Sequence, residues 1–316
     1  MLKANWLPDG VRSRLIVNPL NPLIYIKSLK QLLEPIYGAN VRIKTAKSTG
    51  GGCINQTQVL SLSNGERVFL KHNSSPPENF FTAEAKGLHL LGKAKNGPRT
   101  PRALGVSSGP NPKYLLIEYI ESSSSDSQFP VRFARALAGM HRETQGQYGL
   151  DHDNYIGSTV QKNDAESDGI IFFRDHRIRF QQELARKTRG LPTDVDRRLD
   201  RLCNKLETLL DFTNEKPALL HGDLWSGNYF SSQDQVPCIF DPAVYFGPRE
   251  ADLAMTEMFG RLPQQFYSAY HEAFPLNPGY TQRKEIYNLY HLLNHYNLFG
   301  GSYLSSADQT VRSFVG

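Results

Sequence analysis

Cysteine is scarce in this chain. Among its 316 residues, only Cys53, Cys203 and Cys238 occur. They are odd in number and far apart in the sequence, so neither a disulfide framework nor a zinc site is indicated. This cysteine usage favours a reducing compartment.

Long hydrophobic runs are missing as well. No apolar stretch reaches the roughly 20 residues that a membrane-spanning helix needs. Residues 15–22 contain two prolines in place of the apolar core of a signal peptide. We therefore expect no membrane contact and a cytoplasmic location. For residues 1–22, three interpretations stay open: an extension of unknown role, a weak organelle-targeting segment, or a tail from a misplaced start codon.

Charge of one sign is not concentrated anywhere. The chain has 36 Lys and Arg against 31 Asp and Glu, a net charge of +5, and its longest basic run is residues 186–189. That run is typical of a solvated helix end. The modest positive charge fits a protein that handles phosphorylated ligands, and it predicts no nucleic-acid partner. An apolar fraction of 39% supports a packed core in one large domain or two lobes.

The first third of the chain predicts a small sheet with helices. Residues 23–36 predict a helix, because apolar residues recur there at helical spacing. Strands are predicted at 41–44, 57–62 and 68–71, and Asn64-Gly65 predicts a hairpin between the last two.

A glycine-rich turn and a lysine frame these strands. Gly50, Gly51 and Gly52 join the first two strands, and Lys71 ends the third. Glycines let backbone N–H groups approach phosphate oxygens, although flexible turns use the same residues. The pattern is not a Walker A loop, which needs a helix directly after the glycines.

A helix is predicted at 78–93, with Glu84 on the same face as Leu88. A carboxylate turned toward a core is costly unless it is paired, and Lys71 is the expected partner. In kinase lobes such a pair holds the lysine against the nucleotide phosphates. The alternative is an exposed Glu84 and a helix phase that is wrong by one residue.

The strand predicted at 114–120 is followed by a polar stretch, which we interpret as a hinge. Backbone groups of Glu118 and Ile120 are candidates for the adenine edge of ATP. The next helix, at 131–142, begins a larger lobe. The predicted organisation is an extension at 1–22, an N-lobe at 23–120, a hinge at 121–128 and a C-lobe at 129–316.

The C-lobe is predicted to be mainly helical. Residues 153–163 are polar and irregular, which fits a substrate-side loop or a long connection. His291 and His295 are one helical turn apart. Without an acidic third ligand nearby, packing or substrate contacts explain them better than a metal does. Helices are predicted at 170–187, 195–212, 250–259, 264–274 and 282–298.

The most informative stretch is 219–228, which contains Asp223 and Asn228, with Asp241 after a short apolar run. A carboxylate can take the proton of an attacking hydroxyl, the role predicted for Asp223. Magnesium prefers carboxylate and amide oxygens, so Asn228 and Asp241 are its predicted ligands. The order Asp, Asn, Asp is that of a protein-kinase catalytic loop and its metal-binding Asp. A turn of capping residues beside a strand is the alternative.

Together these motifs resemble the fructosamine kinase (ketosamine kinase) family. The resemblance runs from about residue 30 to about residue 304. It is carried by residues 50–55, Phe69-Leu70-Lys71, residues 81–91 with Glu84, residues 154–159, His221-Gly222-Asp223-Leu224-Trp225-Ser226-Gly227-Asn228, Asp241-Pro242-Ala243 and residues 293–300.

The resemblance implies an α+β, bilobal, protein-kinase-like fold, with a small antiparallel β lobe with one helix and a larger helical lobe. It implies that ATP and Mg²⁺ are used to phosphorylate the third-carbon hydroxyl of ketosamines, such as fructosamine or ribulosamine adducts on amines or lysine, which repairs glycated protein. Carried over, Asp223 is the base, Asn228 and Asp241 bind magnesium, Lys71 contacts phosphates and Glu84 orients it.

Three further residues gain roles from the resemblance. Trp225 is placed to stack on the sugar's apolar face, with core packing as the alternative, and His295 is a substrate candidate. Cys53 lies where some members have a redox-responsive cysteine, so the chain is expected to be a monomer or a redox-linked homodimer; a small residue that the loop tolerates is the alternative.

One departure from the family pattern bears on substrate range. Residues 163–166 lack the tryptophan that often follows this loop in the family.

Three other interpretations of the function remain. The rival with the same chemistry is a phosphotransferase of the aminoglycoside or choline kinase type. A pseudokinase and a protein kinase are disfavoured, because the reactive residues are present and the His-Arg-Asp and Ala-Pro-Glu elements are missing.

Overall fold

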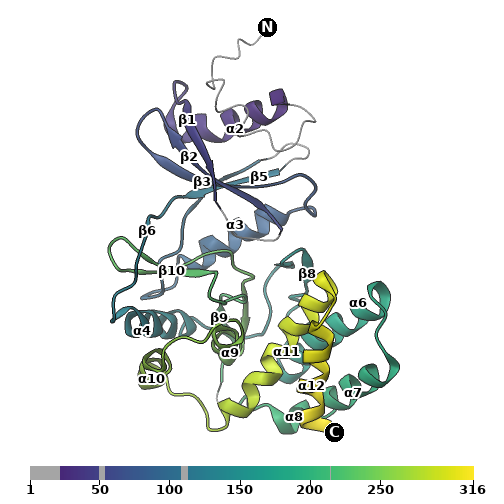
Figure 1. Ribbon diagram of the computed structural model, residues 1–316. Helices are drawn as coiled ribbons and strands as arrows, with labels where there is room; N and C mark the ends of the chain where they lie inside the picture. The colour runs from purple at the N-terminus through teal and green to yellow at the C-terminus, as the bar shows by residue number, and fades with distance from the viewer. Residues whose placement is uncertain (1–21, 50–53, 108–112, 214) are drawn as a thin grey trace. The chain divides into compact units, whose positions relative to one another are not determined.

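The computed structural model of the chain describes residues 22–49, 54–107, 113–213 and 215–316 (Figure 1). Its described residues form the predicted α+β combination of an antiparallel sheet and a helical region. The chain divides into two units, considered separately below. Unit 1 covers Met1–His89 and Thr100–Glu121, and unit 2 covers Leu90–Arg99 and Ser122–Gly316.

Unit 1 is built on a five-stranded antiparallel sheet with the order β1-β2-β3-β5-β4. Its strands are β1 (Ile43–Ser48), β2 (Gln56–Leu62), β3 (Arg67–Asn73), β4 (Ala103–Val106) and β5 (Lys113–Glu118). Sequence reasoning missed β4. All four of its residues are half-buried, so the alternation of buried and exposed positions that identifies a strand is missing there.

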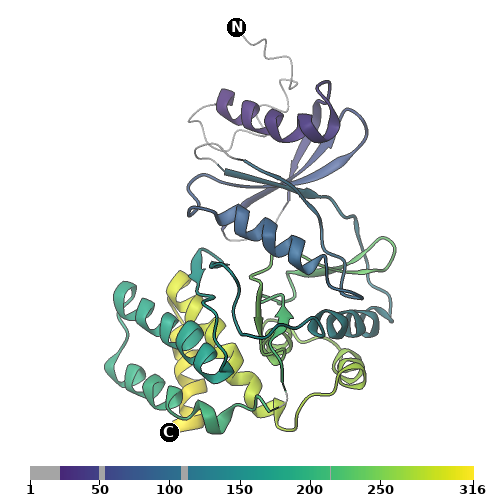
Figure 2. The same cartoon turned by 180° about the vertical axis from the view of Figure 1, so that it is seen from behind.

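The two faces of this sheet carry different helices, α2 (Pro22–Tyr37) and α3 (Phe80–Leu91), as Figure 2 shows. Successive side chains of a strand point to opposite faces. Leu70 of β3 therefore packs in one core with Leu29 and Leu33 of α2. Its neighbour Lys71 points to the other face, toward α3.

Unit 2 contains three small antiparallel sheets, with the strand orders β11-β10-β6, β12-β9 and β7-β8. Their strands are β6 (Ser122–Ser123), β7 (Asn154–Ile156), β8 (Thr159–Gln161), β9 (Ala218–Leu220), β10 (Tyr229–Ser232), β11 (Pro237–Ile239) and β12 (Tyr245–Gly247). The irregular stretch expected at 153–163 is therefore the β7–β8 hairpin.

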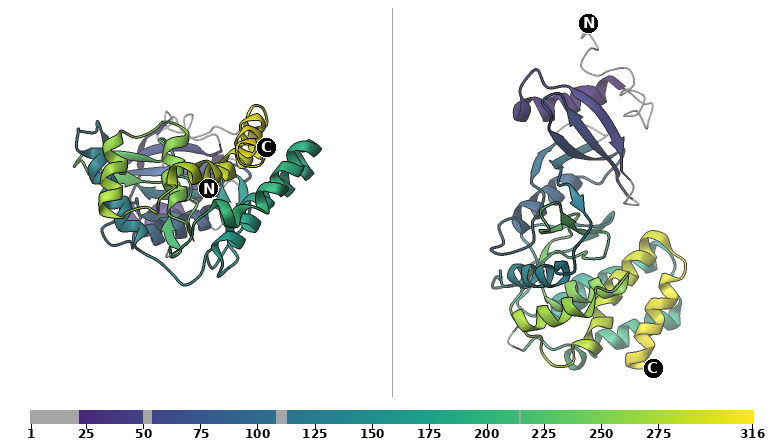
Figure 3. Two further views of the ribbon diagram at one scale, coloured as in Figure 1. Left: turned by 90° about the horizontal axis from the view of Figure 1, so that it is seen from below. Right: turned by 60° about the vertical axis from the view of Figure 1, so that its left-hand side comes forward.

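Helices form the rest of unit 2. They are α4 (Phe129–His141), α5 (Gly169–Phe172), η1 (Phe173–Arg179), α6 (Phe180–Thr188), α7 (Thr193–Cys203), α8 (Leu206–Leu209), α9 (Glu250–Met258), α10 (Gln264–Ala273), α11 (Tyr280–Phe299) and α12 (Tyr303–Val315). Helix α11 contacts α6 and α12, and α12 contacts α7 (Figure 3). In the described part of the chain, no helix is long and apolar enough to cross a membrane.

Two predicted long helices are interrupted in the structure. The helix expected at 170–187 contains η1, a π-helical segment whose turns are wider than those of an α-helix. The helix expected at 195–212 is two helices, because α7 ends at Cys203 and Asn204 caps it. Apolar spacing alone reports neither a wider turn nor a short break.

Candidate active site

Strand β9 leads directly into residues 221–228 of the predicted catalytic stretch, which begins at the end of the two-stranded β12-β9 sheet. Leu220 pairs with Tyr245 of β12, and the next pairing is a hydrogen bond from the Ala243 N–H to the His221 carbonyl oxygen, 2.9 Å long. Gly222 follows with φ +83°, and a Cβ there would lie 2.0 Å from the Ala243 carbonyl oxygen. Only glycine fits this close approach, and it turns the chain toward Asp223.

The carboxylate of Asp252, in the first turn of α9, holds this turn. It accepts hydrogen bonds from the backbone N–H groups of His221 (2.7 Å) and Gly222 (2.8 Å), and His141 Nε2 lies 3.3 Å from it. Burial works against its charge, but the interactions with His141, and then with His221 and the Gly222 N–H, outweigh burial and keep the pKa of Asp252 below its usual value. Sequence reasoning missed Asp252 and His141.

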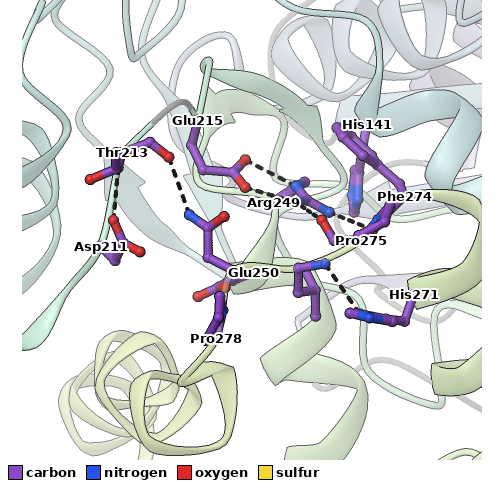
Figure 4. Close-up of polar contacts among 12 residues, drawn as sticks. His141, Asp211, Thr213, Glu215, Arg249, Glu250, His271, Phe274, Pro275 and Pro278 are labelled. Atoms are coloured by element: carbon purple, nitrogen blue, oxygen red, sulfur yellow. Dashed lines mark hydrogen bonds and ion pairs between the residues drawn. The ribbon is translucent and has the colours of Figure 1, made fainter.

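The N-terminus of α9 is itself tied down (Figure 4). Arg249 is buried and forms a bidentate ion pair with Glu215, with distances of 2.7 and 2.9 Å. It also donates to the carbonyl oxygens of Phe274 and Pro275. Because Arg249 directly precedes α9, these bonds fix the start of the helix that carries Asp252.

His221 acts as a spacer between two backbone segments. Its Nδ1 accepts from the Asp223 N–H at 3.2 Å, and its Nε2 lies 2.9 Å from the Phe240 carbonyl oxygen. Burial lowers the pKa of His221, which favours the neutral ring that can accept at Nδ1 and donate at Nε2. The ring thus joins the segment of Asp223 to the residue before Asp241.

The amide of Asn228 connects the two acids. Its Nδ2 donates to the backbone oxygen of Asp223 (2.8 Å), to Asp223 Oδ2 (3.2 Å) and to the backbone oxygen of Asp241 (3.4 Å). Asp241 has φ +59°, a left-handed conformation that Asp tolerates better than most residues. The structure therefore gathers the three polar residues of the predicted catalytic stretch around one side chain.

The carboxyl group of Asp223 has a pKa well above that of an ordinary aspartate. Burial is the main cause that raises the pKa of Asp223 to about 8; the charges of Asp241 and Asp252 add to this shift, and the hydrogen bond from Asn228 opposes it. Among the described residues, no group of three or more His, Cys, Asp or Glu side chains could hold a metal ion by itself. One carboxylate and one amide fit magnesium, which keeps water and phosphate oxygens in its shell.

The raised pKa of Asp223 makes a prediction about stability. The folded-state pKa lies above the usual value of 3.8. The protonated carboxyl therefore favours folding at low pH, and that contribution is lost as the pH rises through about 8. Without nucleotide and magnesium, we expect Asp223→Asn to raise the Tm, and to raise it more at pH 8 than at pH 5. Thermal unfolding across this range in EDTA measures it.

Asp164→Asn, at an exposed acid of the same unit, is the matched control. If the Tm difference between Asp223→Asn and the parent protein stays constant with pH, the titration assigned to Asp223 is wrong.

Unit 1 contains the predicted ion pair. Lys71 Nζ lies 2.6 Å from Glu84 Oε1, and both side chains are less than 10% exposed. The pair joins β3 to α3, as the helix phase predicted. The glycines 50–52 and Cys53 lie outside the described residues.

The hinge-strand candidates remain predictions. The backbone N–H of Glu118 donates to the Arg102 carbonyl oxygen at 2.9 Å, and its carboxylate accepts from the Arg102 N–H. The backbone N–H of Glu118 is therefore engaged within the sheet, and an adenine contact by the backbone of Glu118 stays a prediction. Ile120 lies just beyond β5.

Trp225 and His295 of unit 2 are linked through Ser226 and Phe259. The Trp225 ring lies over Gly227 and is 37% exposed. The next residue, Ser226, donates to the Phe259 carbonyl oxygen at 3.0 Å. The Phe259 ring is 5.2 Å from that of His295. Burial lowers the pKa of His295.

Comparison with known proteins gives consistent findings. The family model described as fructosamine kinase matches residues 25–316. A Synechocystis protein assigned as a ketoamine kinase is 38% identical, over 93% of this chain and 98% of its own. A chloroplastic protein-ribulosamine 3-kinase of Oryza sativa subsp. indica is also 38% identical, over 88% of this chain and 81% of its own.

Solved structures similar to this chain include a member of the same family and a more distant phosphotransferase. A crystal structure assigned as a fructosamine-3-kinase from Haemophilus somnus has a TM-score of 0.82 at 30% identity, covering 92% of this chain and 97% of that one. The aminoglycoside phosphotransferase APH(2")-IIa, solved with gentamicin, has a TM-score of 0.61 at 13% identity, covering 94% and 97%. The second likeness concerns the fold alone.

Proposed function

Because this chain belongs to the fructosamine kinase family and is a kinase, we propose that it transfers the terminal phosphate of ATP to the third-carbon hydroxyl of a ketosamine. Fructosamine and ribulosamine adducts on amines or lysine are the proposed substrates. The observation that carries the proposal is the cluster of Asp223, Asn228 and Asp241 around one amide.

In the proposed reaction Asp223 is the general base. The hydroxyl oxygen of the sugar forms a bond to the terminal phosphorus, the bond from that phosphorus to the ADP oxygen breaks, and the hydroxyl proton passes to the Asp223 carboxylate. Without magnesium the pKa of Asp223 is raised to about 8; bound magnesium would lower this pKa, which favours the carboxylate form that accepts the proton. Asn228 holds the carboxylate in place at 3.2 Å.

Magnesium, when bound by Asn228 and Asp241, would neutralise phosphate charge and offset the negative potential around Asp223. In unit 1, Glu84 holds the Lys71 ammonium at 2.6 Å. We propose that this pairing presents the lysine to the phosphates, the role it has in kinase lobes. A buried ion pair adds little stability by itself, so a functional role explains the Lys71–Glu84 pair better than stability does.

The proposed product chemistry explains why a cell would use the enzyme. Phosphate on the third carbon makes the ketoamine adduct unstable, so the amine is recovered. We therefore propose protein deglycation as the role.

Trp225 supplies a prediction about the sugar. An exposed indole offers an apolar face to the C–H groups of a polyol. We expect Trp225→Ala to raise the KM for the ketoamine several-fold and to leave the KM for ATP nearly unchanged. Steady-state kinetics with each substrate varied in turn measures both. Trp225→Phe keeps a smaller aromatic face and should lie between, whereas a larger change in the ATP KM would contradict the stacking role.

The proposed function is tested by ATP consumption with magnesium in the presence of ribuloselysine, a fructosamine analogue, choline or kanamycin. Turnover on a ketoamine, with none on choline or kanamycin, is expected. Turnover on the amino alcohols alone would assign the chain to the aminoglycoside or choline kinase type. That result would leave the roles of Asp223, Asn228 and Asp241 in place and overturn the substrate.

A further inference from the structure

Arg177 is a fully buried arginine whose described hydrogen-bond acceptors are all neutral. It lies in η1 at 0% exposure. Its guanidinium donates to the backbone oxygens of Lys162 and His176 and, at 2.9 Å, to Asn163 Oδ1. A buried charge is costly unless its surroundings compensate for it.

Three aromatic rings supply part of that compensation. The guanidinium carbon lies 4.0 Å from the ring centre of Tyr245, 4.6 Å from that of Phe172 and 5.4 Å from that of Tyr290. Cations are attracted to the faces of such rings. The cage thus fixes Arg177 against β12, the strand that pairs with the catalytic β9.

Arg177 also begins a chain of buried amides. Asn163, held by Arg177, donates to Asn154 Oδ1 at 3.0 Å, and Gln161 donates to the same oxygen at 2.8 Å. Tyr290 donates to Gln161 Oε1 at 2.8 Å. The three amide side chains come from the β7–β8 hairpin and the residues after it, and all are at most 5% exposed.

This series of hydrogen-bonded amides ends at the backbone of Ala243 and Val244, which directly follow Asp241 and Pro242. Asn154 Nδ2 donates to the Val244 carbonyl oxygen at 2.6 Å, and Gln161 Nε2 donates to that of Ala243 at 2.9 Å. These carbonyls follow Asp241 by two and three residues. Ala243 in turn pairs with His221, two residues before Asp223.

We propose that Arg177 is a positioning residue, which through Asn163, Asn154 and Gln161 fixes the segment after Asp241 and so sets the place of both acids. The proposal rests on the roles proposed above for Asp223 and Asp241. The left-handed backbone of Asp241 makes such support useful, because strained conformations persist only where their surroundings enforce them.

The test uses Arg177→Lys, which keeps the charge and loses the fork that reaches two acceptors at once. Residues that orient metal ligands typically change metal affinity or activity by about 10- to 100-fold when replaced. We expect Arg177→Lys to weaken magnesium-dependent binding of AMP-PNP about 10-fold by calorimetry, with binding in EDTA unchanged. The kcat should fall by a similar factor, more than the KM for the sugar changes.

Gln161→Met is the second variant, because it removes both donations of that amide and leaves Arg177 in place. It should shift magnesium-dependent binding in the same direction, and it decides the question if Arg177→Lys does not fold. Arg198→Lys is the control. Arg198 is also buried, but it ties α7 to α12 through Asp308, and its second partner, Asp194, lies within α7.

Arg177→Lys and Gln161→Met variants that unfold at lower temperature, yet bind magnesium and AMP-PNP like the parent protein, would overturn the proposal. An equal loss of binding in Arg198→Lys would overturn it too. Because AMP-PNP binding needs no sugar, these outcomes can be read even if the ketoamine assay fails.

Discussion

Asp223→Asn is expected to lower kcat by at least ~10²-fold, the usual scale for the loss of a general base. Asn has the same shape and can still accept the hydrogen bond that Asn228 donates at 3.2 Å, so the site should keep its geometry. Binding of AMP-PNP with magnesium should therefore persist. Turnover at saturating ATP and ketoamine, together with calorimetric binding, measures the two effects separately.

Asp164→Asn again serves as the control, since it removes one acid from the surface of unit 2. Near-normal turnover in Asp223→Asn would show that another group takes the proton. Lost activity together with lost nucleotide binding would point to a collapsed site and not to a missing base.

Asp241→Ala is expected to abolish magnesium-dependent nucleotide binding. The change removes the only carboxylate in the proposed metal-binding pair, and a hard cation binds poorly to one amide alone. Calorimetric titration of AMP-PNP with and without magnesium measures the loss. Full affinity in the variant would refute the assignment of Asp241 as a metal ligand.

Asp241→Asn is needed beside it, because position 241 has φ +59°. Asn adopts this conformation more easily than Ala does, so Asp241→Asn removes the charge with less backbone strain. If Asp241→Asn binds magnesium and nucleotide normally while Asp241→Ala does not, the defect of the alanine variant comes from the backbone.

The local parts of the site could be predicted from the sequence. Asp223, Asn228 and Asp241 lie within one short stretch, where a turn and a strand end decide their meeting, and the structure brings them together. The Lys71–Glu84 pair followed from the phase of one helix and the end of one strand. The roles of these residues stay predictions until the variants are measured.

The distant supports could not be predicted. Asp252 reaches back 30 and 31 residues to the motif, and His141 meets Asp252 across 111 residues. Helical spacing shows which face of a segment is buried, and it does not show which distant backbone N–H will meet a carboxylate. Sequence reasoning also missed helix α12, which packs against α7 although about 100 residues separate the two helices in the sequence.

The π-helical turns of η1 constrain chain length as well as composition. A π-helical turn can be regarded as an α-helix that has gained a residue, and each α-helical residue advances about 100° around the axis. Deleting one residue between 173 and 179 would restore α-helical spacing and rotate Arg177 relative to α6. Insertions and deletions in η1 would thus be selected against even where single substitutions are tolerated. A homologue with one residue fewer in η1 would need a different buried contact to position its counterpart of Asp241.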